Sequence, residues 1–77
     1  MKNNYCVKND VANGQSKSYY FETIKEAVEF AQNKSRKDKR NVIVMDCEEL
    51  NGIKTSRKRL YLIRYYNGGI SREKVNA

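Results

Sequence analysis

The strongest strand signal in the pattern of polar and apolar residues lies between Arg57 and Tyr66 (Arg-Lys-Arg-Leu-Tyr-Leu-Ile-Arg-Tyr-Tyr). Leu, Tyr and Ile suit the pleated, half-buried surface of a sheet, so this run predicts a strand. Asn51-Gly52 precedes the run and Asn67-Gly68-Gly69 follows it. Asn-Gly supplies the two positive φ angles of a type I′ hairpin turn. A strand between two hairpin turns pairs on both sides, so we expect it to lie inside a sheet.

A two-residue loop at Asn51-Gly52 sets the register of the first hairpin. The predicted cross-strand pairs are Leu50 with Ile53, Glu49 with Lys54, Asp46 with Arg57, Ile43 with Leu60, and Val44 with Arg59. Side chains alternate with period two. One face therefore collects Ile43, Met45, Cys47, Leu60 and Leu62, and we assign this face to the core. The other face carries Val42, Val44, Arg57, Arg59, Tyr61, Ile63 and Tyr65. A slip of one residue would exchange the two faces.

Two short strands and a helix are predicted before this hairpin. Tyr5 to Val11 and Ser16 to Phe21 read as strands joined at Asn13-Gly14, and a tight turn there places Val7 opposite Tyr20 and Asp10 opposite Lys17. Thr23 and Glu26 have the spacing of a capping box, which marks the start of a helix. Ile24, Ala27, Val28 and Ala31 then recur at the helical period. We expect the helix to end near Asn33 to Arg36, which leaves residues 34–40 as a basic loop.

The strand expected over 41–48 pairs with the one over 53–66, and Ile70 to Val75 can add an edge strand. The order is β-β-α-β-β, with a further strand at the end. This pattern predicts one small α+β domain over residues 1–77, with a mostly antiparallel sheet and one helix on one face.

Charge is the strongest indication of a partner. The chain has 77 residues, with 16 Lys and Arg against nine Asp and Glu, a net charge of +7. Such an excess favours an acidic partner, namely nucleic acid, a nucleoprotein complex, an anionic membrane or an acidic protein. The alternative is an ordinary lysine-rich surface. No apolar run reaches the ~18 residues of a membrane span, and no signal-peptide pattern is present. We therefore expect a cytoplasmic protein without a membrane partner.

The residue types argue against an enzyme. The chain has no histidine, which excludes Ser-His, Cys-His and His-metal sites. Cys6 and Cys47 are two isolated cysteines and cannot form a four-cysteine zinc site. We expect the acidic residues Asp46, Glu48 and Glu49 to pair with Lys54 and Arg57 rather than to act in acid-base catalysis. No phosphate-binding or dinucleotide-binding glycine motif is present. We expect no catalytic residue, no metal site and no cofactor.

The candidate binding residues are basic and aromatic. Two basic segments flank the strand 41–48. The first contains Lys34, Arg36, Lys37, Lys39 and Arg40, and the second contains Lys54, Arg57, Lys58 and Arg59. Together they can form a stripe that contacts several phosphates. Tyr61, Tyr65 and Arg64 of the central strand, with Tyr20 beside them, can stack on bases or pair with phosphates. The alternatives are two solvated loops, and tyrosines that pack under the chain ends or in a homodimer.

The amino-acid composition gives an indication of the source of the protein and, through it, of its class of function. The chain is rich in Asn, Lys, Ile and Tyr and lacks Pro, Trp and His, a bias typical of AT-rich coding sequences. Small basic chains of this kind are common in phages and mobile elements. We expect a nucleic-acid-binding accessory protein of such an element, with phosphate contacts and little base specificity. One alternative is a protein-binding inhibitor or interaction module, for example of a host defence or nucleic-acid-processing complex, using the same Tyr and Arg residues. Another is a structural homodimer.

Overall fold

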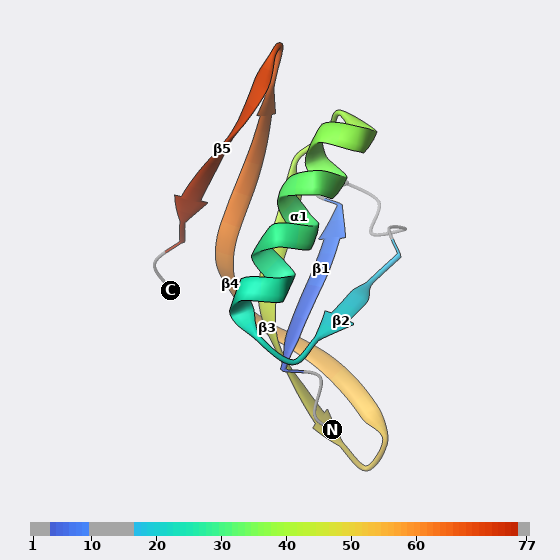
Figure 1. Cartoon of the computed structure of the whole chain (residues 1–77). Coiled ribbons are helices and arrows are strands. Elements are labelled where there is room, and N and C mark those ends of the chain that lie inside the picture. Colours follow the sequence, from blue (N-terminus) through green and yellow to red (C-terminus); the bar gives the residue numbers. More distant parts are fainter. Residues whose placement is uncertain (1–3, 10–16, 76–77) are drawn as a thin grey trace.

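Five strands form one antiparallel sheet, and a single helix packs across one of its faces (Figure 1). The computed structural model describes residues 4–9 and 17–75, apart from the side chains of Leu50, Ser56 and Arg57. The elements are β1 (Tyr5–Asn9), β2 (Tyr19–Phe21), α1 (Ile24–Asp38), β3 (Val42–Leu50), β4 (Ile53–Tyr66) and β5 (Gly69–Lys74). The strand order across the sheet is β2-β1-β3-β4-β5. The predicted α+β class, the element order and the position of the helix on one face are confirmed.

The two described hairpins turn where the sequence predicts. Asn51 (φ 53°) and Gly52 (φ 80°) both adopt positive φ, and Leu50 faces Ile53 as expected from a type I′ turn. In the second hairpin, Tyr66 faces Gly69 across Asn67-Gly68, and Gly68 has a φ of 101°. The predicted Asn13-Gly14 turn and the pair of Asp10 with Lys17 lie outside the described residues.

The first hairpin has a different register from the predicted one. Val7 faces Tyr19 and Cys6 faces Tyr20, so the predicted pair of Val7 with Tyr20 is wrong by one residue. That prediction assumed a two-residue turn. The Asn13-Gly14 turn itself lies outside the described residues, and the described pairs of β1 with β2 do not have the register that such a turn would give.

The register between β3 and β4 shifts twice, between Val44 and Cys47. As a result Ile43 faces Leu62 rather than Leu60, and Val44 faces Tyr61 rather than Arg59. In the irregular region the Lys58 backbone N–H donates a hydrogen bond of 2.6 Å to the Asp46 carboxylate. This bond satisfies a backbone group that the interrupted ladder leaves unpaired.

The helix covers the sheet face opposite the predicted core face. Val7, Val42, Val44 and Ile63 are fully buried there, against the helix residues Ala27, Val28 and Ala31. Ile43 and Met45 are also buried, but they lie on the opposite face.

The bulges explain this error. Arg59 faces Met45, and paired residues share a face, so Arg59 lies opposite the helix. The straight register had placed Arg59 beside Val44 and Tyr61, which made that face appear too basic for a core.

The helix starts as predicted and ends later than predicted. The Thr23 hydroxyl accepts a hydrogen bond from the Glu26 backbone N–H at 3.2 Å and donates to the Glu26 carboxylate at 2.9 Å. The helix continues to Asp38, where Lys39 (φ 55°) caps it in the left-handed conformation. The predicted basic loop is therefore mostly the last turns of α1. The buried Ser35 hydroxyl, which donates to the Arg40 carbonyl at 2.7 Å, stabilises this longer end.

Within residues 4–9 and 17–75, no helix has both the length and the apolar character needed to cross a bilayer.

Candidate functional site

The two basic segments lie along different parts of β3, since the second extends from the far end of the strand to its middle, where Arg59 faces Met45. Arg40 precedes β3, whereas Lys54 faces Glu49 near the far end of the strand. Seven residue steps from Val42 to Glu49 correspond to roughly 23 Å at the usual rise of a strand. The segments therefore form two separate groups rather than one compact patch.

The first group lies at the C-terminal end of α1, and we call it the helix-end cluster. It comprises Lys34, Arg36, Lys37, Lys39 and Arg40. Two of these cations already have neighbours. Lys34 Nζ lies 3.0 Å from the Asp38 carboxylate and 4.9 Å from the centroid of the Tyr19 ring. The Arg36 guanidinium donates to the Asn33 amide oxygen at 3.5 Å.

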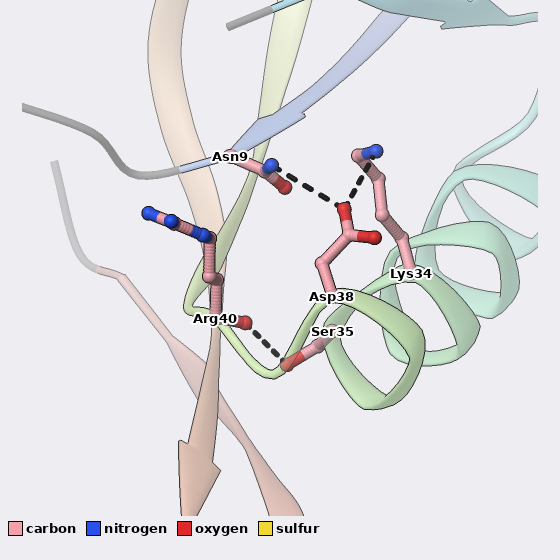
Figure 2. A network of polar contacts seen from close by, with 5 residues as sticks. All are labelled: Asn9, Lys34, Ser35, Asp38 and Arg40. Atoms are coloured by element: carbon pink, nitrogen blue, oxygen red, sulfur yellow. Dashed lines mark hydrogen bonds and ion pairs between the residues drawn. The ribbon is translucent and has the colours of Figure 1, made fainter.

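Asp38 organises the polar contacts beside this cluster (Figure 2). The hydrogen bond from Lys34 and a second one from the Asn9 amide, at 3.4 Å, hold the pKa of Asp38 below its ordinary value. The Arg40 side chain points away from Asp38 in Figure 2. Lys37, Lys39 and Arg40 are exposed, and among the described residues none of them forms an ion pair. These three cations are free to contact an anionic partner.

The second group borders the sheet face opposite α1, which we call the uncovered face because the single described helix packs on the other side of the sheet (Figure 1). Strand pairing places Cys6, Ile43, Met45 and Leu62 in its centre. Cys6, Ile43 and Met45 are 0, 3 and 9% exposed, whereas Leu62 is half-buried. The centre of this face is therefore apolar and largely closed to solvent, although no described helix packs on it.

Cations surround the apolar centre of the uncovered face. Lys8 faces Ile43 and Arg59 faces Met45, and Arg59 is exposed. Arg64, on the same face as Leu62, forms an ion pair with Glu73 at 2.6 Å. Both side chains of this pair are more than 40% exposed, so water screens it and a phosphate can compete for the arginine.

The β3–β4 hairpin contributes a further contact to the uncovered face. Lys54 Nζ lies 4.9 Å from the centroid of the Tyr20 ring, and Tyr20 faces Cys6 on this side of the sheet. The cation–π contact connects the hairpin to β2, and it places a half-buried aromatic ring beside a lysine.

The tyrosines of the predicted basic-aromatic face lie elsewhere. Tyr61 packs against the core beneath α1, and the Arg72 guanidinium lies 5.6 Å from its ring centroid. Tyr65 is half-buried on the same side, and its backbone N–H donates to the Asn41 side chain at 2.9 Å. These two rings are therefore not on the uncovered face, and the predicted combination of Arg59 with Tyr61 and Tyr65 is wrong.

Sequence reasoning missed two residues of the uncovered face. Lys8 is there because it alternates with the buried Val7, and Tyr66 because it alternates with Tyr65 at the end of β4. Tyr66 is 53% exposed. Period two along each strand would have found both residues if the helix side of the sheet had been known. Of the predicted binding residues, Lys58 is exposed, and the side chain of Arg57 lies outside the described part.

The cysteine and acidic side chains of the described part show no arrangement typical of a catalytic site. Burial, with the neighbouring Cys6, raises the pKa of the Cys47 thiol, which disfavours its nucleophilic thiolate form. Both cysteines are free thiols. In the described part of the chain, no three His, Cys, Asp or Glu side chains are grouped so that they could hold a metal ion.

Comparison of the chain with protein-family models, with curated proteins and with solved structures finds no match in any of the three.

Proposed function

We propose that this protein is a nucleic-acid-binding accessory protein that binds a single strand across the uncovered face. The observation that carries the proposal is the apolar centre of that face with Lys8, Arg59 and Arg64 around it. The AT-rich type of composition supports a phage or mobile element as the source.

A single strand fits this surface better than a duplex does. The apolar surface of a sheet contacts the faces of bases, and only unstacked bases present their faces. Leu62 is half-buried and supplies such a surface, and Tyr20 and Tyr66 supply aromatic rings at its borders. A duplex would present phosphates alone and would make no contact with Leu62 or with the aromatic rings.

The cations set the expected salt dependence. Each phosphate neutralised on a single strand contributes about −0.7 to the slope of log K against log salt concentration. Lys8, Arg59 and Arg64 together give a slope of about −2. Lys39 and Arg40 extend the positive charge beyond the face, at the end where β3 begins. Because phosphate contacts carry no sequence information, we expect little base specificity.

The test measures fluorescence anisotropy of labelled dT12, U12 and a 12-base-pair duplex from low to moderate salt. We expect both single strands to bind more tightly than the duplex. Lys8→Glu and Arg59→Glu are each expected to weaken binding at least about tenfold and to reduce the salt slope by roughly 0.7. Lys74→Glu is the matched control, because Lys74 is exposed and faces Tyr61 on the helix side of the sheet.

Two outcomes contradict the proposal. Equal losses in Lys74→Glu and Arg59→Glu would mean that net charge, rather than the uncovered face, determines binding. Absence of binding at low salt, with a native circular dichroism spectrum, would exclude nucleic acid as the partner. Sedimentation on the same sample shows whether a homodimer buries the face instead.

A further inference from the structure

A groove lies on the other side of the sheet, between α1 and the β4–β5 hairpin. Ile24, Val28 and Gln32 of α1 form one wall, Tyr61 of β4 forms the floor, and Arg72 of β5 stands opposite the helix. Its volume is about 390 Å³, within the range of sites that accept ligands or large side chains.

The groove exists because one helix is too narrow for this sheet. Strands lie about 4.8 Å apart, so the axes of the outer strands of this five-stranded sheet are roughly 19 Å apart. A helix with its side chains is only about 10–12 Å wide. On the β2 side the remaining width is filled by aromatic rings. Phe30 of α1 lies 4.9 Å from Tyr19 and 5.0 Å from Phe21, measured between ring centroids. On the β4–β5 side Tyr61 and Ile70 pack against the core, and a groove remains beside α1.

The border of the groove carries positive charge without acidic partners. The Arg72 side chain is exposed and lies over the Tyr61 ring at 5.6 Å. Lys25 is exposed on the helix side. Neither residue forms an ion pair with a described carboxylate, and Glu29 is the single acidic side chain that lines the groove. A complementary ligand therefore presents an apolar surface flanked by carboxylates.

We propose that this groove binds an amphipathic helix of a partner protein, with the apolar side inward and acidic residues toward Lys25 and Arg72. The wall from Ile24 to Gln32 corresponds to about 12 Å of helix, or roughly two turns of a helix lying alongside. Helices pack with their axes about 8–10 Å apart, so a second helix beside α1 would lie over β4 and β5. Recognition of an amphipathic helix by an apolar groove is a common mode of protein binding. The site is separate from the uncovered face and does not depend on nucleic-acid binding.

The probe is a labelled 16-residue helical peptide with Leu and Phe on one side and Glu on the flanks. Two comparison peptides keep its length: one replaces Glu by Lys, and one has the same composition in an order without an apolar side. The full chain, uniformly labelled with ¹⁵N, is titrated with each peptide. We expect only the first peptide to bind, with amide shifts concentrated at Lys25, Val28, Tyr61 and Arg72.

Variants then separate the groove from general charge attraction. The double variant Lys25→Glu/Arg72→Glu is expected to bind the acidic peptide at least about tenfold more weakly. The control double variant Lys37→Glu/Lys39→Glu makes the same change in net charge outside the groove and should retain binding. The substituted side chains are exposed, so both variants are expected to fold. A native amide spectrum checks this for each variant.

Four results of the peptide titrations would overturn the inference. The groove is excluded if the acidic peptide does not bind at millimolar concentration, or binds no better than the reordered peptide. It is also excluded if the shifts map to the uncovered face, or if both double variants lose binding equally. Oligonucleotide binding by Lys25→Glu/Arg72→Glu, measured in parallel, reports on the uncovered face alone, so failure of one proposal is distinguished from failure of the other.

Discussion

Two adjacent residues of β4 test which face of the sheet forms the main core. Ile63 is 0% exposed beneath α1, whereas Leu62, the preceding residue, is half-buried on the uncovered face. We predict that Ile63→Ala destabilises the protein more than Leu62→Ala does. The straight hairpin register, which assigned Leu62 to the core, would give the opposite order.

The magnitudes follow from burial. Removal of a fully buried Ile side chain costs about 2–5 kcal/mol, because both the transfer free energy and the contacts around the resulting cavity are lost. Leu62 keeps part of its surface in water, so its truncation costs about 1–2 kcal/mol. A chain of 77 residues has a total stability of roughly 4–12 kcal/mol. Ile63→Ala therefore removes a large fraction of the stability, and Leu62→Ala a small one.

Urea unfolding followed by far-ultraviolet circular dichroism measures both costs. If Ile63→Ala does not fold, Ile63→Val replaces it, with an expected cost of about 0.5–1.5 kcal/mol. The corresponding fall in melting temperature is about 4–8 °C per kcal/mol for a domain of this size. Equal costs for the two Ala variants, or a greater cost for Leu62→Ala, would refute the assignment of the helix to the face of Ile63.

Three further predictions concern the helix ends and the thiols. Thr23→Ala removes the acceptor of the Glu26 N–H and should cost about 1 kcal/mol in thermal unfolding, whereas Thr23→Ser should restore most of it. The Lys34 hydrogen bond lowers the pKa of Asp38, so Asp38 contributes stability above the ordinary pKa of an aspartate and loses it as the pH falls through the lowered value. The urea midpoints of wild type and Asp38→Asn should therefore converge in acid, and a constant difference down to pH 2.5 would contradict this. Burial raises the pKa of Cys47, so iodoacetamide at pH 8 should modify it more slowly than a free cysteine, and an equal rate would count against that burial.

Local chemistry made much of the fold predictable. The Asn51-Gly52 turn and the capping box of Thr23 depend on neighbouring residues alone, and the structure confirms both. The end of α1 was not predictable in this way. It depends on the Ser35 hydroxyl, which is buried by the fold and bonded to the Arg40 carbonyl, and a serine in the sequence does not reveal that environment.

The candidate site was harder to predict because it depends on sheet geometry. The two shifts between β3 and β4 add up to two residues, so residues such as Val44 and Tyr61 still share a face, as predicted. Arg59 lies between the two shifts, and it is on the opposite face from the predicted one. Both faces of β3 and β4 are apolar, and the identity of the covered face follows only from the packing of α1 against Val42, Val44 and Ile63. A bulge leaves no simple signal in the spacing of apolar residues, and so the sequence pattern alone places Arg59 on the same face as Tyr61 and Tyr65.

The most direct test of nucleic-acid binding on the uncovered face is an amide-resolved titration of the ¹⁵N-labelled protein with dT8. We predict shifts at Lys8, Arg59, Leu62 and Arg64, and little change at Lys25 and Glu29 on the outer side of α1. Shifts confined to α1, or no shifts at low salt, would contradict the account.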